Sequence, residues 1–360
     1  MNIGMIVRAT FYSSPGGDTT QIEMTARYLR RLGIVVDIKL TNDTLDYKKY
    51  DLLHFFNIIR PDDILPHINH DVPFVVSPIL VDYSEYEKKN RQGILGKLFS
   101  ILNPSQIEYL KAWARWIKNG DKIKSYYYLS NGHHKSLIRI AREARMLLPN
   151  SDSEYYRLKK EIGFEVPYLK IPNAIDHEIF QENVAEEIQF KDHVLCVGRI
   201  EGRKNQLMLI RALAGMEINL SIIGKPSPNH IAYYEECKRV ASGYNNIHFI
   251  EQIDHSKLPG IYKASKVHVL ASWFETTGLS SLEAAAMGCN IVVTKKGDTE
   301  EYFGEKAYYC EPDDVDSIRT AIVQAYTNTR MPGLRDFIFN HYTWSQAAQQ
   351  TLKAYKIVLE

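Results

Sequence analysis

The sequence predicts an α/β protein with two domains, and three observations carry this prediction. The chain has 360 residues, which is long for a single hydrophobic core and sufficient for two. Short apolar runs typical of strands alternate with helical patterns, which indicates parallel sheets with helices on their faces. The alternation stops at a charged segment, residues 182–192, and starts again after it. We therefore expect domains at 1–182 and 183–335, with a last helical segment at 336–360.

The first predicted domain begins with a strand, a turn and a helix. An apolar run opens the chain, and the turn SSPGGD follows it at 13–18. Apolar side chains then recur at helical spacing from Ile22 to Leu32, which predicts a helix with Asp18 as its N-cap and Gly33 as its stop. The strands expected in this domain lie at residues 2–8, 34–40, 51–56 and 73–80.

The second predicted domain has apolar runs with few polar interruptions. Such runs are typical of strands that are buried on both faces of a parallel sheet. The expected strands lie at 193–199, 218–224, 246–250, 266–272 and 290–294, and helices are expected at 206–213 and 233–240.

The composition excludes several classes of protein. The 44 basic and 43 acidic residues give a net charge of +1, which argues against a general nucleic-acid binder. No apolar run approaches the ~20 residues that span a bilayer, and the start of the chain lacks the pattern of a secretory signal. We therefore expect a cytoplasmic protein. Its four cysteines are widely spaced and predict reduced thiols: Cys196, Cys237, Cys289 and Cys310.

One part of the chain is strongly basic. Residues 87–147 contain thirteen Lys or Arg against four Asp or Glu, together with several aromatic residues. A surface that meets anionic lipid or a phosphate-bearing substrate has these ingredients. The alternatives are a solvated helical face whose aromatic side chains enter the core, and a platform for single-stranded nucleic acid.

Several common motifs are missing from the sequence. No G-x-G-x-x-G follows a predicted strand, and there is no G-x-x-x-x-G-K-[ST] phosphate loop. The D-x-D sequence at Asp314 and Asp316 lies directly before a helical pattern, where aspartates commonly cap the helix. His133 and His134 have no partner at ligand spacing. We therefore expect no metal site.

The strongest functional signal is the segment at residues 266–294. A buried strand runs into a loop, and a helix is expected to begin near Gly278. Loops at the carboxyl ends of parallel strands are where open α/β sheets bind ligands. Glu275 lies in the loop and Glu283 lies in the helix, so both carboxylates can line one site and accept hydrogen bonds from neutral hydroxyl groups. The alternative is one exposed glutamate in a loop and another on a helix.

The same loop is suited to bind an anion. Backbone N–H groups at the start of a helix point at such a ligand, and a glycine allows close approach. The residues expected to supply these groups are Thr276, Thr277, Gly278 and Leu279.

Cations follow another predicted strand. Arg199 comes directly after Gly198, and Arg203 and Lys204 lie a few residues on, before a helix. A forked guanidinium and a compact ammonium at the end of a strand suit a diphosphate, whereas the alternative is a set of surface salt bridges. In the first domain, Gly16 and Gly17 follow the first strand and allow backbone to approach a ligand.

Together these residues resemble the family 4 retaining glycosyltransferases of the GT-B fold. The resemblance covers nearly the whole chain in the expected order and includes supporting segments at 171–176 and 340–348. It rests mainly on the spacing of Gly198, Arg199 and Lys204, on Glu275 and Glu283 with Phe274, Gly278 and Leu279, and on the pair Gly16 and Gly17. It implies two Rossmann-like domains that face each other across a cleft, with the donor bound by the second domain.

The resemblance also implies a role for each matching residue. Arg199 and Lys204 would bind the donor diphosphate and stabilise its charge as the sugar leaves, with Gly17 facing the phosphates. Glu275 would accept hydrogen bonds from the transferred sugar, and Glu283 from the ribose. Residues 276–279 would contact the phosphates or the sugar. Such enzymes need no divalent metal or other cofactor.

The implied activity is a hexosyl transfer that retains anomeric configuration. The donor would be a UDP- or GDP-sugar, and the acceptor a glycan or a lipid-linked molecule, as in surface polysaccharide or glycoconjugate biosynthesis. The basic stretch at 87–147 would then place the protein peripherally at the inner face of the cell membrane.

The first domain departs from the family in one respect. Many members carry a histidine at the end of a strand near the donor sugar, and the corresponding stretch at 73–86 has none. The acceptor-side candidates that remain are His54 and Asp82. Two alternatives use the same scaffold: a nucleotide-sugar epimerase, and a non-catalytic protein that binds sugar nucleotides.

Overall fold

The computed structural model describes residues 1–90, 102, 104–119 and 123–360. It divides the chain into two compact units. Unit 1 comprises Met1–Asn173 and Trp344–Glu360, and unit 2 comprises Ala174–Thr343. The expectation of two α/β domains, each with a parallel sheet, is confirmed.

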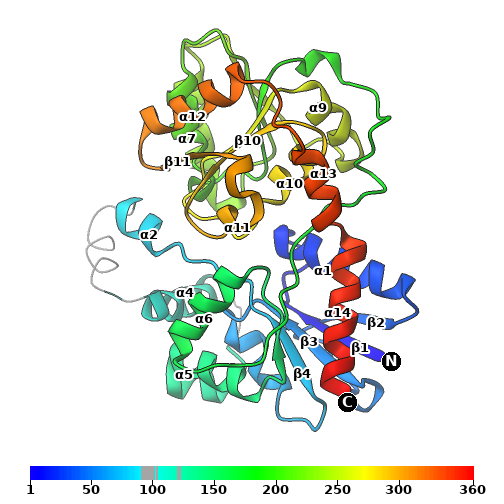
Figure 1. The fold of residues 1–360 in the computed structure, drawn as a ribbon. Coiled ribbons are helices and arrows are strands. Elements are labelled where there is room, and N and C mark those ends of the chain that lie inside the picture. The colour runs from blue at the N-terminus through cyan, green and yellow to red at the C-terminus, as the bar shows by residue number, and fades with distance from the viewer. Residues whose placement is uncertain (91–101, 103, 120–122) are drawn as a thin grey trace. The chain divides into compact units, whose positions relative to one another are not determined.

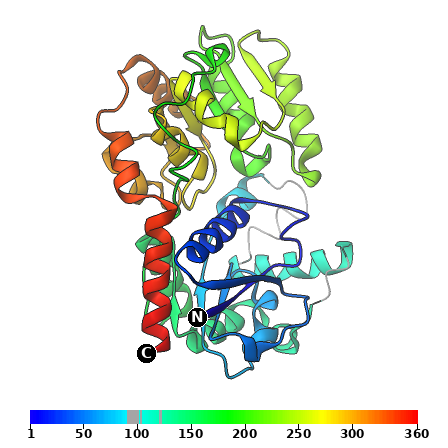
Figure 2. The same ribbon diagram turned by 90° about the vertical axis from the view of Figure 1, so that its right-hand side faces the viewer.

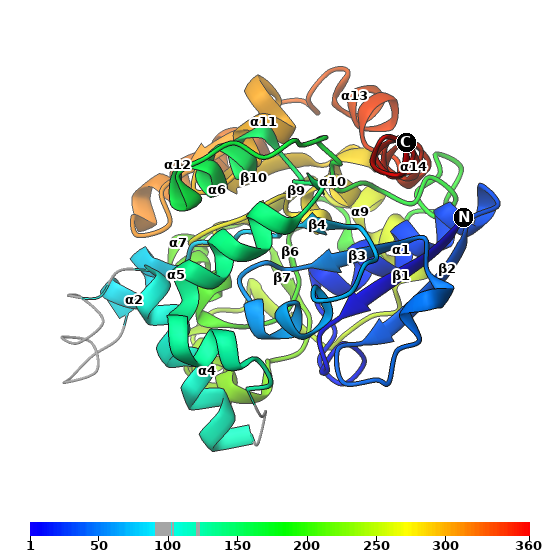
Figure 3. The same cartoon turned by 90° about the horizontal axis from the view of Figure 1, so that it is seen from below.

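Unit 1 is built on a five-stranded parallel sheet in the order β2-β1-β3-β4-β5. Figure 3 shows β4, β3, β1 and β2 side by side. The middle strands β3 and β4 are buried along their whole length, as expected when both faces of a parallel sheet are covered. The strands are β1 (Asn2–Val7), β2 (Val35–Leu40), β3 (Leu52–Phe56), β4 (Phe74–Ser77) and β5 (Met146–Leu147).

The helices of unit 1 include one from the end of the chain. Helix α14 packs along α1, so the last residues complete the unit that the first residues begin (Figures 1 and 2). The helices are α1 (Gly17–Arg31), α2 (Ser84–Asn90), α4 (Pro104–Asn119), α5 (Tyr126–Glu143), α6 (Asp152–Ile162) and α14 (Trp344–Leu359).

Unit 2 is built on a six-stranded parallel sheet in the order β11-β10-β9-β6-β7-β8. Its strands are β6 (Val194–Val197), β7 (Leu220–Ile223), β8 (Ile247–Ile250), β9 (Val267–Leu270), β10 (Asn290–Thr294) and β11 (Tyr308–Cys310). Its helices are α7 (Gln206–Leu213), α8 (Ile231–Ala241), α9 (Leu258–Ala264), α10 (Leu279–Ala286), α11 (Thr299–Phe303), α12 (Val315–Thr327) and α13 (Leu334–His341).

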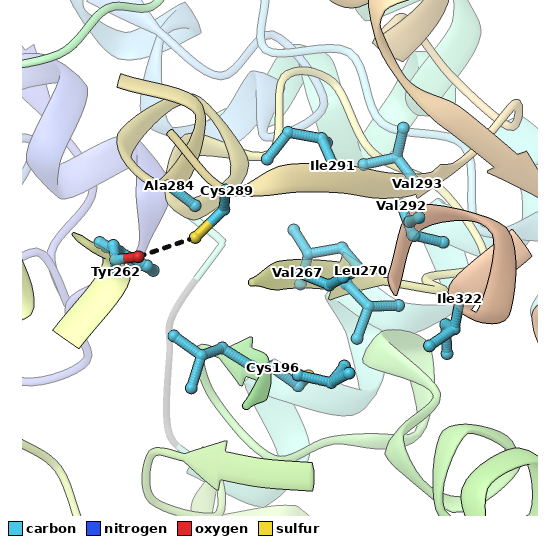
Figure 4. Close-up of a cluster of buried hydrophobic side chains, with 14 of the residues drawn as sticks. Cys196, Tyr262, Val267, Leu270, Ala284, Cys289, Ile291, Val292, Val293 and Ile322 are labelled. Carbon is cyan, nitrogen blue, oxygen red and sulfur yellow. Dashed lines mark hydrogen bonds between the residues drawn. The ribbon is translucent and has the colours of Figure 1, made fainter. Parts of the chain in front are cut away.

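The core of unit 2 contains the four cysteines as buried, free thiols. Burial raises the pKa of Cys196 and Cys289 to about 12, so both thiols are protonated at neutral pH. The Cys289 thiol donates a hydrogen bond to the carbonyl oxygen of Tyr262, with a distance of 3.0 Å between sulfur and oxygen (Figure 4). These cysteines therefore serve packing.

The unit boundaries differ from those expected from the sequence. The chain passes between the units at 173–174 and 343–344, rather than near 182 and 335. The charged segment at 182–192 belongs to unit 2, because its Phe190 is buried there and the Glu187 amide donates to the Gly260 carbonyl. Only the final helix, α14, belongs to unit 1.

A histidine ties three elements of unit 1 together. His54 in β3 is buried, and its two ring nitrogens lie 2.7 Å from the Tyr355 hydroxyl of α14 and 2.9 Å from the Ser77 hydroxyl of β4. Burial lowers the pKa of His54 to about 3, so the ring is neutral at pH 7. This network helps to fix α14 against the sheet.

We expect the substitution Tyr355→Phe to destabilise unit 1 by about 1–3 kcal/mol, because it leaves a buried nitrogen of His54 without its hydroxyl partner. Urea unfolding measures the loss, and hydrogen exchange should place it in β3 and α14. The control Tyr12→Phe alters a tyrosine of the same unit that is 63% exposed and should change stability by less than ~0.5 kcal/mol. Equal effects of the two substitutions would contradict the role of the network.

Candidate functional site

The candidate site lies in unit 2, where the strand order reverses. Strands β6 and β9 are neighbours in the sheet, and from them the chain proceeds outward in opposite directions, to β7 and β8 on one side and to β10 and β11 on the other. At such a switch point the loops at the carboxyl ends of the two central strands diverge and leave room for a ligand. The two strongest sequence motifs follow these two strands.

The loop after β6 is held by its backbone. The Gly198 amide donates to the Ile223 carbonyl at 3.0 Å, and the Gly224 amide donates to the Ile250 carbonyl. A Cβ added at Gly224 would lie only 2.0 Å from the Gly198 carbonyl oxygen, and Gly224 has a φ of +149°. The close approach of these loops therefore requires glycine, and it fixes the point from which Arg199 projects.

Lys204 and Glu275 form an ion pair across the two motifs. The Lys204 ammonium lies 2.5 Å from a carboxylate oxygen of Glu275, a residue 71 positions later in the sequence, and Glu275 is buried. Lys204 closes a short 3₁₀ turn, Gly202–Lys204, and Asn205 follows with a φ of +63°. The Asn205 amide group donates to the Ala271 carbonyl after β9, which anchors the β6 loop to the β9 loop. The structure thus brings together the two residues that the sequence predicts to share a site.

The backbone of Glu275 is held by the loop after β10. Its amide donates to the Lys296 carbonyl at 3.0 Å, and its carbonyl accepts from the Asp298 amide at 2.9 Å. Gly297 lies between these partners with a φ of +108°, and an added Cβ would lie 2.0 Å from the Glu275 carbonyl oxygen. The loop after β10 therefore clamps the Glu275 loop through main-chain contacts.

Helix α10 begins where the sequence predicts. Gly278 is its N-cap with a φ of +72°, and the helix runs over Leu279–Ala286. The first amides of an α-helix have no partner within it, which makes its N-terminus suited to an anion. Thr276 and Thr277 complete the turn between Glu275 and this helix.

Glu283 lies on α10 and is held by two side chains that sequence reasoning missed. One carboxylate oxygen lies 2.7 Å from Nε2 of His255, and the other accepts a hydrogen bond from the Tyr262 hydroxyl at 3.4 Å. The hydrogen bond that His255 donates to Glu283 raises the pKa of His255 against the opposing effect of burial, and the charges of Glu283, Asp176 and Asp254 raise this pKa further. Neither residue belongs to a recognisable local motif.

Glu201 is a further residue that the sequence did not single out. Its carboxylate is only 2% exposed and lies 3.1 Å from Arg203 and 3.8 Å from Arg199, whose own side chain is 45% exposed. Ser227 donates to the same carboxylate at 3.2 Å. Burial raises the pKa of Glu201, but the cations Arg203, Arg199 and Lys204 outweigh it and hold the pKa below its ordinary value. An ionised Glu201 therefore orients both arginines; its place between them in the sequence RIEGR was the available signal.

Comparisons with known proteins show that this chain is similar to glycosyltransferases. Residues 191–328 match the family described as "Glycosyl transferases group 1". The chain is 26% identical over 322 residues to N-acetylgalactosamine-N,N'-diacetylbacillosaminyl-diphospho-undecaprenol 4-alpha-N-acetylgalactosaminyltransferase of Campylobacter jejuni, covering 82% of this chain and 83% of that protein. It is 24% identical over 253 residues to O-antigen chain mannosyltransferase B of Escherichia coli, covering 64% of each.

The chain is a glycosyltransferase whose residues 191–328 match the group 1 family.

Solved structures share the fold of this glycosyltransferase. Sucrose-phosphate synthase from Thermosynechococcus elongatus superposes with a TM-score of 0.76 at 16% identity, covering 99% of both chains. Anabaena HepE, solved in complex with UDP and glucose, gives a TM-score of 0.69 at 14% identity and covers 99% of this chain and 100% of its own. The expected GT-B fold is therefore confirmed.

The glycine loop of the glycosyltransferase lies in unit 1. Gly16 is the N-cap of α1 and Gly17 is its first residue. The expectation that Asp18 caps this helix is wrong, because its carboxylate instead pairs with Arg8 at 2.7 Å. Arg8 also donates to the carbonyl oxygen of Ser14, so it holds the loop that precedes the two glycines.

The two acceptor-side candidates lie in different settings. His54 is buried in the core of unit 1, where Tyr355 and Ser77 engage both of its ring nitrogens, and this geometry favours a structural role. Asp82 is exposed, and its carboxylate accepts a hydrogen bond from the Ser84 amide at the start of α2. The structure does not bring the two side chains together as a pair.

The D-x-D sequence caps a helix, as predicted. The Asp314 carboxylate accepts from the amides of Asp316 and Ser317 at the start of α12.

We expect Gly297→Ala to disrupt the candidate site, because the new methyl group meets the Glu275 carbonyl and the backbone has a positive φ. Such strain costs about 1–3 kcal/mol, and relief of the clash must displace the Glu275 loop. Glycosyl transfer should fall at least ~10-fold, measured as initial rate at saturating donor.

The matched control is Gly304→Ala. Gly304 also has a positive φ, of +51°, but an added Cβ meets no atom within 4 Å. The Gly304→Ala variant should lose stability without a comparable loss of glycosyl-transfer rate. Equal losses of this rate in both variants would contradict the conclusion that the loop after β10 holds the Glu275 loop in place.

Proposed function

We propose that this glycosyltransferase moves a hexose from a UDP- or GDP-sugar to a lipid-linked or glycan acceptor, with retention and without a divalent metal. The observation that carries the proposal is the assembly of Arg199, Lys204, Glu275 and Glu283 around the carboxyl ends of β6 and β9. These residues come from two loops and one helix, and each matches the family motif in residue type.

The cations explain how a diphosphate leaving group is stabilised. As the bond between the sugar and the diphosphate breaks, negative charge grows on the phosphate oxygens. Arg199 and Lys204 meet this charge, and the amides at the start of α10 add oriented donors. Because both cations are anchored to buried carboxylates, little reorganisation is needed when the charge appears. This arrangement supplies the stabilisation that a metal ion supplies in other enzymes.

The carboxylates bind hydroxyl groups in this proposal. Glu275 accepts from the sugar that is transferred, while Glu283 accepts from the ribose of the nucleotide. Neither serves as a covalent nucleophile, because attack of the acceptor on the same face from which the diphosphate leaves retains configuration. The anomeric configuration of the product, read by NMR, tests this step.

The relatives support the proposed substrates. HepE was solved with UDP, which favours a nucleoside diphosphate donor. The Campylobacter relative carries diphospho-undecaprenol in its name, and the Escherichia relative is an O-antigen chain mannosyltransferase. Both names point to acceptors in surface polysaccharide or glycoconjugate assembly.

We place the protein in the cytoplasm, peripherally at the inner face of the membrane. Among the described residues, no helix combines the length and apolarity that a bilayer crossing requires. The basic stretch 87–147 includes described side chains suited to an interface: Tyr126 is 89% exposed, and Arg139 lies over the Tyr127 ring. Residues 91–101, 103 and 120–122 of this stretch lie outside the described residues.

Two single substitutions test the donor site. Wild-type protein should gain a few degrees in thermal midpoint with UDP or GDP, because a ligand at ~100 times its dissociation constant stabilises by ~2.7 kcal/mol. Lys204→Ala and Glu283→Ala should lose this gain, and Lys204→Ala should lower turnover ~10²–10³-fold, with EDTA having no effect on the wild type. Lys238→Ala, which removes a half-exposed lysine of α8, is the control. Absence of any nucleotide-dependent shift, or loss of turnover in EDTA, would contradict the proposal.

Nucleotide-sugar binding and turnover, measured together, also separate the transferase from its alternatives. An epimerase changes the nucleotide sugar without an acceptor, and a non-catalytic protein binds it without turnover. An epimerase needs an acid–base pair at the sugar. Both ring nitrogens of His54 are already engaged inside unit 1, away from any exposed acid–base partner, and this favours the transferase.

Liposome flotation tests the membrane placement. We expect binding to vesicles that contain phosphatidylglycerol and much weaker binding to neutral phosphatidylcholine vesicles, with the difference falling as salt screens the charges. Replacing the exposed basic residues Lys88, Lys89 and Lys135 by Gln should weaken the binding. Equal binding to both kinds of vesicle would overturn the membrane placement.

A further inference from the structure

The Glu283 carboxylate is held at both of its oxygens. Nε2 of His255 lies 2.7 Å from one oxygen, and the Tyr262 hydroxyl donates to the other at 3.4 Å. Tyr262 is fully buried, whereas the His255 side chain is 47% exposed. The carboxylate is therefore fixed from the core by one residue and from the solvent side by the other.

Local structure sets the position of His255. Asp254 caps the turn His255–Lys257 by accepting from the Ser256 amide at 2.8 Å. The turn leads directly into α9, and the Phe180 ring packs edge-on against the imidazole with 5.5 Å between ring centroids. The imidazole thus reaches Glu283 from a short, capped turn rather than from a free loop.

This geometry has a consequence for ligand binding. An ionised carboxylate offers about four sites for hydrogen bonds, so two bonds to protein leave capacity for two hydroxyl groups. The two protein bonds also restrict rotation of the carboxylate, which reduces the entropy lost when a ligand binds. Two adjacent hydroxyl groups, such as those of ribose, can both donate to the carboxylate when its two remaining acceptor sites are held in one fixed plane.

We propose that His255 is a positioning residue that orients the Glu283 carboxylate toward the 2′ and 3′ hydroxyls of the donor ribose. This inference rests on the proposed function of Glu283 and names a residue outside the family motif. The charges that face His255 support it: Glu283, Asp176 and Asp254 raise the pKa of the imidazole and strengthen the contact.

Nucleotides with and without ribose hydroxyls test the proposal. Isothermal titration calorimetry compares UDP and GDP with their 2′,3′-dideoxy analogues in the wild type, His255→Ala and His255→Gln. We expect His255→Ala to weaken the ribonucleotide about 5–10-fold and the dideoxy analogue less than about twofold, because only the hydroxyls report on the Glu283 carboxylate. His255→Gln, which keeps an N–H near the position of Nε2, should restore affinity to within about twofold of the wild type.

The control is His341→Ala, in the same unit, where the imidazole bonds to the Phe337 carbonyl of its own helix. It should leave both affinities unchanged. Equal weakening of the ribonucleotide and the dideoxy analogue by His255→Ala would overturn the proposal, since His255 would then act on another part of the ligand or on folding. No weakening would overturn it as well. If the wild type binds no nucleoside diphosphate, the proposed function fails first, and this inference falls with it.

Discussion

The ion pair between Lys204 and Glu275 is the interaction on which the candidate site depends. It joins the loops after β6 and β9, which are neighbours in the sheet although their sequences are far apart. A buried carboxylate is costly unless a cation and hydrogen bonds compensate it, and the removal of one partner leaves the other uncompensated. The two motifs are therefore physically coupled: each is stable in its observed place because the other lies beside it.

Two glycines make this coupling possible because they lack a side chain. Gly224 allows the loop after β7 to approach Gly198, and Gly297 allows the loop after β10 to bond to both peptide groups of Glu275. A side chain at either position would separate loops that now meet through their backbones. The charged residues of the site are thus placed by main-chain contacts from the flanking strands, and side-chain contacts refine them.

The sequence predicted what local patterns encode and missed what distant packing decides. Apolar runs located the strands, and the helix start at Gly278 followed from its glycine and its spacing. The capping role of Asp18 failed because Arg8, ten residues earlier, binds its carboxylate. Glu283 was found from its motif, but its partner His255 was not, because only the tertiary fold brings that turn against α10. Charge alone likewise suggested a linker at 182–192, where burial of Phe190 places the segment in unit 2.

The balance of charge in the site suits a transferase that must release its product. Three cations, Arg199, Arg203 and Lys204, share two buried carboxylates, Glu201 and Glu275. A site with uncompensated cations would bind the diphosphate product about as strongly as the transition state, and such uniform binding does not accelerate the chemical step. Under the proposed function, the carboxylates would lower the resting attraction for a diphosphate, and they would hold the cations where charge develops as the sugar leaves. In the proposed mechanism, the same pairs that stabilise the fold would therefore direct binding energy toward the transition state.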